Sequence, residues 1–186
     1  MPLQQPPRAV TFDLWLTLMF EESTGRHELR VREGVQALSN AGITIPPKKL
    51  GDAIRTIGRE TNADHDRGFD RTSVERMQQI LAAADPNARA SINNEQFEAF
   101  SRAIDEPFLA HSPTIYPTAQ SVLSLIKEMG VRTALISNVG STSPGVYRRY
   151  LDREGISQYL EYLTFSNEIA SAKPGAKMFT HTLEKL

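Results

Sequence analysis

The sequence predicts an α/β protein whose parallel-sheet core carries a large helical insertion. Toward both ends of the chain, short apolar segments that end in polar residues alternate with helical segments, which is typical of parallel strands joined by helices. Between them, residues 20–110 show helical periodicity with no intervening strand. We therefore expect residues 1–19 and 111–186 to form the core and residues 20–110 to form an all-helical cap.

The first strand is expected at residues 9–13, after a proline-rich lead-in that spans residues 1–8. The apolar run of this strand ends at Asp13. In open α/β sheets the ligand crevice lies outside the carboxyl ends of the strands, so Asp13 stands where a carboxylate can act as a nucleophile. An aspartate at a strand end also commonly caps a turn, and this segment alone does not decide between the two roles.

Four helices are expected in the cap. The first ends near Gly42, the second begins at residues 46–47, the third ends before residues 85–86, and one of the asparagines at 93–94 caps the fourth. Their apolar stripes are interpreted as the core of the cap. These stripes consist of Leu29, Val35, Leu38, Leu50, Ala53, Ile54, Ile57, Val74, Met77, Leu81, Ala84, Phe97, Phe100 and Ile104.

The core resumes near residues 116–117 with a helix that Thr118 is expected to cap and Gly130 to end. The remaining elements are expected in this order: a strand at 131–136, a polar turn at 137–140, a helix near 144–154, a strand near 162–166 and a helix after Pro174. This alternation implies parallel pairing with right-handed crossovers.

Two of these segments carry polar residues that fit the chemistry of Asp13. Ser137 and Asn138, which are both expected to bind the substrate, follow a buried strand, and Lys173 precedes a helix. The Ser137 hydroxyl and nearby backbone N–H groups would hydrogen-bond an anionic group, and Lys173 would keep Asp13 ionised and neutralise a bound phosphoryl or carboxylate group. Thr17 is expected to orient Asp13 or to add a donor. Taken singly, a turn residue or a solvated lysine would explain each of them.

The order of these motifs resembles that of the haloacid dehalogenase superfamily, a group dominated by phosphatases. The resemblance runs from Ala9 to Leu186 and rests on the strand with Asp13 and Thr17, on Ser137-Asn138, and on Lys173-Pro174. It implies a Rossmann-like core with a cap inserted after the first motif. It also implies a covalent aspartyl intermediate, a small anionic metabolite as substrate, phosphoryl hydrolysis as the leading activity, and Mg²⁺ as a cofactor with Asp13 among its ligands.

Trp15 departs from the phosphatase pattern, because those enzymes usually have a second aspartate two residues after the nucleophile. That aspartate protonates the leaving group and then activates water, and an indole ring can do neither. The haloacid dehalogenases proper have an aromatic tyrosine at this place, and a halide leaves without a proton. The alternative function is therefore a carbon–halogen hydrolase that needs no metal, in which Trp15 lies beside the substrate.

Other departures leave the alternatives open. Phe179 stands where those dehalogenases have tyrosine, and Leu16 replaces a glycine that is usual before Thr17. Their halide-binding arginine has no motif to mark it, so Arg26, Arg30 and Arg32 are candidates only. The family's fourth motif, which supplies a carboxylate for Mg²⁺, has no counterpart in this sequence. We expect an incomplete core that belongs to a longer gene product, and a catalytically inactive binding protein is a third alternative.

Composition narrows the function further. The 186 residues contain no cysteine, which excludes thiolate metal sites. The formal net charge is −1 and the basic residues are dispersed rather than clustered, so the sequence does not indicate a nucleic-acid partner. The sequence shows neither a signal peptide nor an apolar stretch of the roughly 20 residues that span a membrane. We expect a cytoplasmic protein, of unassigned oligomeric state. The four histidines, His27, His65, His111 and His181, lack metal-ligand spacing and are interpreted as surface or packing residues.

Overall fold

The computed structural model describes residues 7–22 and 24–186, so that most of the predicted lead-in lies outside the described residues. The fold is α/β, as the sequence predicts. Three parallel strands form the main sheet in the order β1 (Ala9–Phe12), β4 (Arg132–Ser137), β5 (Tyr162–Phe165). A small antiparallel pair of strands, β2 (Met19–Phe20) and β3 (Thr114–Ile115), was not expected from the sequence.

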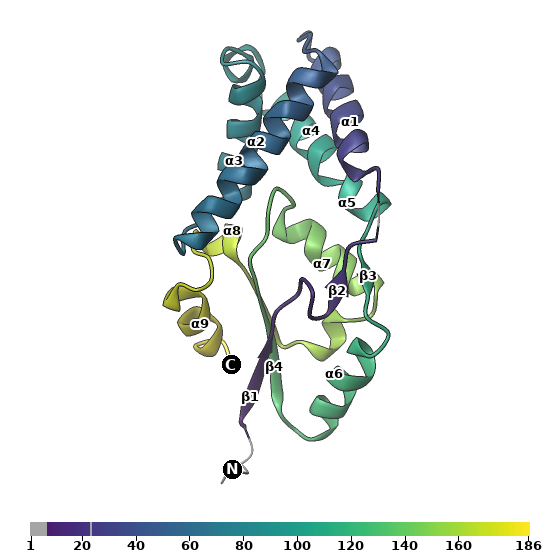
Figure 1. Ribbon diagram of the computed structural model, residues 1–186, viewed down its shortest axis with the longest axis vertical. Coiled ribbons are helices and arrows are strands. Elements are labelled where there is room, and N and C mark those ends of the chain that lie inside the picture. Colours follow the sequence, from purple (N-terminus) through teal and green to yellow (C-terminus); the bar gives the residue numbers. More distant parts are fainter. Residues whose placement is uncertain (1–6, 23) are drawn as a thin grey trace.

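The residues between β2 and β3 are largely helical and lie beyond the carboxyl ends of the main strands (Figure 1). We call the helices α1 to α5 the helical region. They are α1 (Arg26–Asn40), α2 (Pro47–Asp66), α3 (Ser73–Ala84), the 3₁₀ helix η1 (Ala88–Ser91), α4 (Asn94–Asp105) and α5 (Pro107–Ala110). The exact boundaries proposed for a cap, after residues 19 and 110, stay a prediction.

The remaining helices flank the main sheet, with α6 and α7 on one side of the strands and α9 on the other (Figure 1). They are α6 (Ala119–Glu128), α7 (Pro144–Arg153), the 3₁₀ helix η2 (Ser157–Tyr159), α8 (Ser166–Ile169) and α9 (Ala176–Leu183). The sheet is therefore covered on both faces, as the alternation of strands and helices requires.

Local sequence signals explain where several helices begin. Thr72 accepts a hydrogen bond from the Glu75 N–H while the Glu75 side chain accepts one from the Thr72 N–H, and Asn93 and Gln96 form the same reciprocal pair before α4. The prediction that an asparagine caps α4 is thus confirmed. Thr118 also occupies the N-cap position of α6, as expected, but its side chain makes no cap hydrogen bond.

The buried apolar side chains form two separate clusters. One packs around the main sheet and includes Leu14, Leu135, Tyr150 and Phe165. The other lies among the helices of the helical region; its largest fully buried side chains are Leu38, Leu50, Ile80, Leu81, Phe100 and Ile104. Most of the predicted apolar stripes fall in this second cluster. Val74 does not, because 55% of it is exposed.

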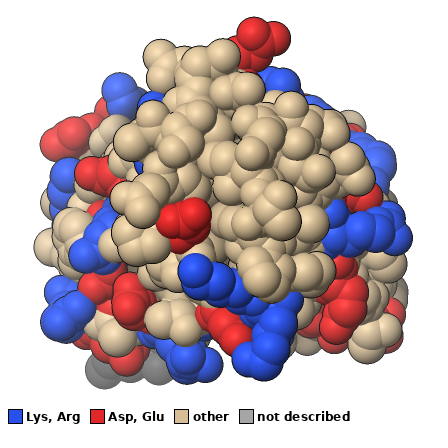
Figure 2. Space-filling view, turned by 90° about the horizontal axis from the view of Figure 1, so that it is seen from above, with Lys and Arg blue, Asp and Glu red and all other residues tan. Residues whose placement is uncertain are grey.

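The surface shows no dominant charge. Seen from the end formed by the helical region, the face is largely uncharged, and blue and red side chains lie mixed around its margin (Figure 2). Within residues 7–22 and 24–186, every helix is too short or too polar to cross a membrane.

Candidate active site

The first feature of the site is an ion pair between residues from opposite ends of the chain. Asp13 follows β1 directly, and its Oδ1 lies 2.7 Å from the Lys173 Nζ. The side chains are 45% and 21% exposed, so the pair is accessible to a ligand. The Leu14 N–H donates to the same Asp13 oxygen at 2.7 Å, and Lys173 Nζ also donates to the Ile136 carbonyl at 2.9 Å. These contacts fix both side chains at the carboxyl ends of β1 and β4.

Asn138 fixes the backbone that carries Lys173. Its Nδ2 donates to the Lys173 carbonyl at 3.0 Å, and its Oδ1 accepts from the Lys173 N–H at 2.7 Å. The amide side chain therefore acts as a two-point clamp between the turn after β4 and the loop before α9. The structure thus brings Asp13, Asn138 and Lys173 together, as the motif spacing predicted, although their chemical roles remain predictions.

The turn after Asp13 has the geometry that a glycine would favour. Leu16 has a φ of +57°, in the left-handed region, and is 78% exposed. A side chain there costs roughly 1–2 kcal/mol relative to the right-handed form. The Leu16 N–H donates to the Met19 carbonyl at 2.7 Å, which holds the turn in place. Replacement of the usual glycine by Leu16 has therefore not changed the turn into a right-handed form.

Thr17 and Ser137 are placed differently from one another. Thr17 lies exposed in the turn, where its N–H donates to the Leu14 carbonyl at 3.4 Å. Ser137 is fully buried at the end of β4, and its hydroxyl donates to the Asn138 carbonyl at 3.2 Å. The Ser137 hydroxyl therefore supports the turn from beneath, and its predicted contact with substrate stays a prediction.

A hollow of about 370 Å³ opens beside the ion pair. Trp15, two residues after Asp13, and Asn138, which clamps Lys173, both line it. Asp13 and Lys173 themselves do not belong to its lining. The rest of the wall comes from α1, α2, α5, α7 and the turn after β4, so the hollow lies where the helical region meets the strand ends.

A larger hollow, of about 630 Å³, lies between α1 and α2 and is lined by residues such as His27, Val31 and Arg55. No residue of the strand ends lines it. Ligands of open α/β sheets bind outside the carboxyl ends of the strands. We therefore take the smaller hollow as the candidate substrate site, although it is not the larger of the two.

Of the three candidate arginines, Arg26 and Arg30 line the smaller hollow and Arg32 lines the larger one. Arg26 forms an ion pair with Glu21 at 2.8 Å and lies over the Phe108 ring at 4.8 Å. These two arginines make this part of the hollow suited to an anionic group.

Among the residues that the structure describes, no carboxylate lies within salt-bridge distance of Arg30. It donates to the Ile104 carbonyl at 2.9 Å and to the Thr142 hydroxyl at 2.8 Å. Burial lowers the pKa of the Arg30 guanidinium from its ordinary value, and the nearby Arg26 lowers it further. A guanidinium held mainly by neutral groups at the wall of a hollow retains capacity to attract an anion.

Trp15 forms a packed wall of the hollow. Its ring meets the buried Phe108 edge-on, with the centroids 6.5 Å apart, and the buried Tyr147 lines the same hollow. Burial raises the pKa of Tyr147 to about 12, so this phenol stays protonated at neutral pH. Neither ring is suited to exchange protons with a substrate near neutral pH.

The donor set beside Asp13 does not fit Mg²⁺. This ion requires near-octahedral oxygen ligation, usually with carboxylates and waters. Within the described part of the chain, no group of three or more histidine, aspartate or glutamate residues is arranged to hold a metal ion. Asp13 itself is paired with Lys173. We therefore derive no chemical step through a metal.

His65 and Asn62 are site residues that the sequence interpretation missed. Both line the smaller hollow from the last turns of α2, and His65 contacts Asp70. Their spacing relative to Asp13 carries no motif, and α2 faces the hollow only because of how the helical region sits over the sheet. No signal in a single sequence would have found them.

Comparisons with known proteins give one family match and a shared fold. The model of the family described as haloacid dehalogenase-like hydrolases matches residues 7–186. No curated protein matches the chain. A 2-haloacid dehalogenase from Pseudomonas syringae pv. tomato DC3000 is similar with a TM-score of 0.61 and 16% identity, over 97% of this chain and 73% of that chain. A predicted phosphoglycolate phosphatase from Haemophilus somnus 129PT has a TM-score of 0.54 and 17% identity, over 96% of this chain and 71% of that chain. An L-2-haloacid dehalogenase from Xanthobacter autotrophicus with chloropropionic acid covalently bound has a TM-score of 0.51 and 14% identity, over 97% of this chain and 65% of that chain. At these identities, the structural likeness concerns the fold alone.

Proposed function

We propose, since the chain belongs to the haloacid dehalogenase-like hydrolase family, that it hydrolyses a small anionic substrate through a covalent intermediate on Asp13. The observation that carries this proposal is the accessible pair of Asp13 and Lys173 at the carboxyl ends of the strands, with 2.7 Å between Oδ1 and Nζ. A lysine this close favours the ionised form of the carboxylate, which is the nucleophilic form.

Phosphoryl transfer is the chemistry we propose first. An Asp13 oxygen attacks phosphorus and forms an acyl phosphate, while the bond from phosphorus to the leaving oxygen breaks and its electron pair departs with that oxygen. Water then attacks the phosphorus, releases inorganic phosphate and restores the Asp13 carboxylate. Lys173 offsets negative charge on the phosphoryl group in both steps, and the clamp by Asn138 keeps the lysine in position.

The hollow indicates the size and charge of the substrate. A volume of about 370 Å³ lies near the lower end of the roughly 300–1,000 Å³ usual for small-molecule sites. Arg26 and Arg30 in its wall would attract a second anionic group, away from the one attacked by Asp13. We therefore propose a small metabolite with two anionic groups, such as a phosphorylated carboxylic acid.

Carbon–halogen hydrolysis is the second candidate, and Trp15 is the observation that favours it. A packed indole ring cannot protonate a leaving alkoxide, whereas a halide leaves with its electron pair and needs no proton. Asp13 would then attack carbon and form an ester, which water would hydrolyse. This candidate requires no metal, whereas the phosphatase function carries the family expectation of Mg²⁺ with Asp13 as a ligand.

The test compares two products in the same preparation. Phosphate release from small phosphomonoesters and chloride release from 2-chloropropionate would be measured with added Mg²⁺ and with EDTA. We expect phosphate release to be lost in Asp13→Asn by on the order of 10⁴-fold or more, as removal of a nucleophile does in other hydrolases. Asp52→Asn is the matched control, because Asp52 also forms exposed ion pairs, with Lys48 and Arg55, but lies away from the site.

Each outcome decides between the candidates. Chloride release that survives EDTA, without phosphate release, would replace the phosphatase by the carbon–halogen hydrolase. Unchanged activity in Asp13→Asn would remove Asp13 as the nucleophile. Binding of inorganic phosphate without turnover of either substrate would favour the inactive binding protein.

A further inference from the structure

We propose that His65, oriented by Asp70, is the acid–base residue of this site and carries out the proton transfers that Trp15 cannot perform. The proposal rests on the proposed function, since it needs a covalent intermediate on Asp13. It assigns a catalytic role to a histidine of the helical region that no motif marks.

His65 is positioned at the candidate substrate site. His65 and Asn62 line the same hollow as Trp15 and Asn138. Just after His65, the Gly68 carbonyl accepts hydrogen bonds from the Ala172 N–H at 3.0 Å and from the Ser171 hydroxyl at 3.4 Å. Figure 1 shows this end of α2 beside the segment that follows α8. The end of α2 is therefore bonded to the residue that immediately precedes Lys173.

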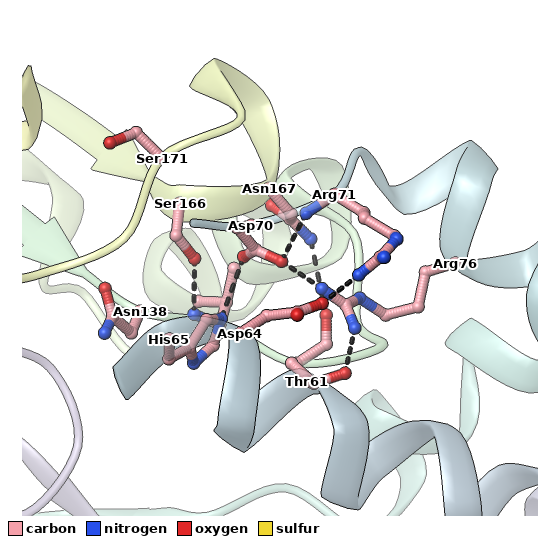
Figure 3. A network of polar contacts seen from close by, with 12 residues as sticks. Thr61, Asp64, His65, Asp70, Arg71, Arg76, Asn138, Ser166, Asn167 and Ser171 are labelled. Carbon is pink, nitrogen blue, oxygen red and sulfur yellow. Dashed lines mark hydrogen bonds and ion pairs between the residues drawn. The ribbon is translucent and has the colours of Figure 1, made fainter. Parts of the chain in front are cut away.

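The Asp70 carboxylate orients the imidazole ring of His65. His65 Nε2 lies 3.0 Å from Asp70 Oδ2, and Asp70 is fully buried whereas His65 is 13% exposed (Figure 3). In acid–base catalysis by histidine, one ring nitrogen donates to a buried carboxylate and the other nitrogen faces the site. Asp70 acts here as a positioning residue, because it contacts His65 rather than the hollow.

Asp70 keeps its Oδ2 available for His65. Its Oδ1 accepts from the Arg71 N–H at 2.7 Å and pairs with Arg76, which in turn donates to Thr61. Figure 3 shows Asp70 between His65 and Arg76. The buried pair of Asp70 and Arg76 thus braces the turn between α2 and α3 through Oδ1 alone. Bracing the turn does not require a histidine at position 65.

The contact with Asp70 also determines which ring nitrogen of His65 would exchange the proton. Because the Asp70 carboxylate accepts from Nε2, the ring carries its fixed proton there, and Nδ1 is left for the second proton. Among the described residues, no hydrogen-bond partner of His65 Nδ1 is recorded beyond the ring's contact with Asp70. We assign Nδ1 as the atom that faces the reacting groups.

The proton transfers balance with the proposed reaction. The His65 imidazolium gives its Nδ1 proton to the leaving oxygen as the phosphorus–oxygen bond breaks, which releases a neutral alcohol. The neutral imidazole then takes a proton from water as the water oxygen attacks the phosphorus of the Asp13 acyl phosphate. Inorganic phosphate leaves, and His65 returns to its protonated form. In carbon–halogen hydrolysis, His65 would take part only in the second step.

A binding experiment tests whether His65 lies at the site. The imidazole NMR signals of the full chain would be followed while inorganic phosphate is added, with the His65 signal identified by its absence in His65→Gln. We expect the His65 signal to shift on phosphate binding and the signal of His181, which contacts Tyr162 outside the site, to stay unchanged. Phosphate binding that leaves the His65 signal unchanged would overturn the proposal.

A kinetic experiment separates catalysis from bracing. In His65→Gln, the amide nitrogen can still donate to Asp70, but the side chain cannot transfer a proton. We expect the first step on an alkyl phosphate to slow by about 10²–10⁴-fold, the usual contribution of general acid catalysis. The first step on p-nitrophenyl phosphate, whose leaving group needs little protonation, should change by less than about 10-fold. Phosphorylated Asp13 should then accumulate, as measured by intact mass.

Failure of this proposal is distinguishable from failure of the proposed function. If His65→Gln slows both substrates equally, or neither, while Asp13→Asn remains inactive, then His65 is structural and the nucleophile assignment stands. If Asp13→Asn keeps full activity, the proposed function itself is wrong. His181→Gln is the matched control and is expected to retain wild-type rates on both substrates.

Discussion

Two aspartate–cation pairs in this chain have nearly the same chemistry and opposite environments. Asp13 and Lys173 meet at the strand ends with side chains 45% and 21% exposed, whereas Asp70 and Arg76 meet inside the helical region with side chains 0% and 1% exposed. An exposed pair contributes about 0–1 kcal/mol to stability, but loss of one partner from a buried pair costs about 3–5 kcal/mol. Access to water therefore separates the two pairs: the first is open to a ligand, and the second is enclosed in the fold.

The neighbours of each pair follow the same division. Asp13 and Lys173 are held by backbone groups, the Leu14 N–H and the Ile136 carbonyl, which leaves their outer faces open to a ligand. Asp70 is fully buried, and one of its hydrogen-bond partners, His65, lines the smaller hollow. In the role proposed above for His65, the buried pair would act on the site through that residue.

The largest expected effect is on stability, and it compares the loss of one partner from the buried pair with the loss of one from the exposed pair. Arg76→Leu leaves the Asp70 carboxylate buried without its cation, so we expect the free energy of unfolding to fall by about 3–5 kcal/mol in urea denaturation. Asp13→Asn should change it by less than about 1 kcal/mol. Replacing both buried partners, as Asp70→Leu with Arg76→Leu, should recover part of the loss. Equal losses for Asp13→Asn and Arg76→Leu would break the comparison.

A smaller effect is expected where the two regions touch. A Cβ added at Gly175 would lie 2.8 Å from the Ala172 carbonyl oxygen and 3.3 Å from the Gly68 carbonyl oxygen. Backbone atoms cannot move aside as a flexible side chain can, so Gly175→Ala should cost about 1–3 kcal/mol in urea denaturation and displace Lys173. Gly58→Ala is the control, since nothing lies within 4 Å of its Cβ and a helical alanine should stabilise α2 by up to about 1 kcal/mol. The opposite order of stabilities would contradict the contact between Gly68 and the Lys173 loop.

The smallest effect concerns Asp105, a half-buried carboxylate that accepts from the Ser143 N–H at 2.8 Å and from the Ser143 hydroxyl. Burial raises the pKa of Asp105 above its ordinary value. Since the folded state then holds the proton more tightly than the unfolded state, the stabilisation is present at acidic pH and is lost as the pH rises through the folded pKa. Relative to Asp105→Asn, the wild type should lose stability between acidic and neutral pH. Urea denaturation of both proteins at several pH values measures the free energy of unfolding. If the wild type became more stable relative to Asp105→Asn as the pH rises, the prediction would be contradicted.

The sequence by itself determined the elements that local rules govern. The apolar run before Asp13, the helical periodicity between β2 and β3, and the capping sequence that begins with Asn93 predicted the strand, the helical insertion and a helix start. The order of Asp13, Asn138 and Lys173 also predicted which residues the strand ends would bring together, because parallel strands place their carboxyl ends at one edge.

Only the tertiary structure decided the rest of the site. It buried the Ser137 hydroxyl, turned Arg26 and Arg30 toward the hollow and Arg32 away from it, and placed His65 beside the strand ends. A single sequence shows which face of a helix is apolar, but not which neighbour a polar side chain on the other face will meet. That neighbour depends on how the helical region packs on the sheet, which is set by contacts between residues far apart in the chain.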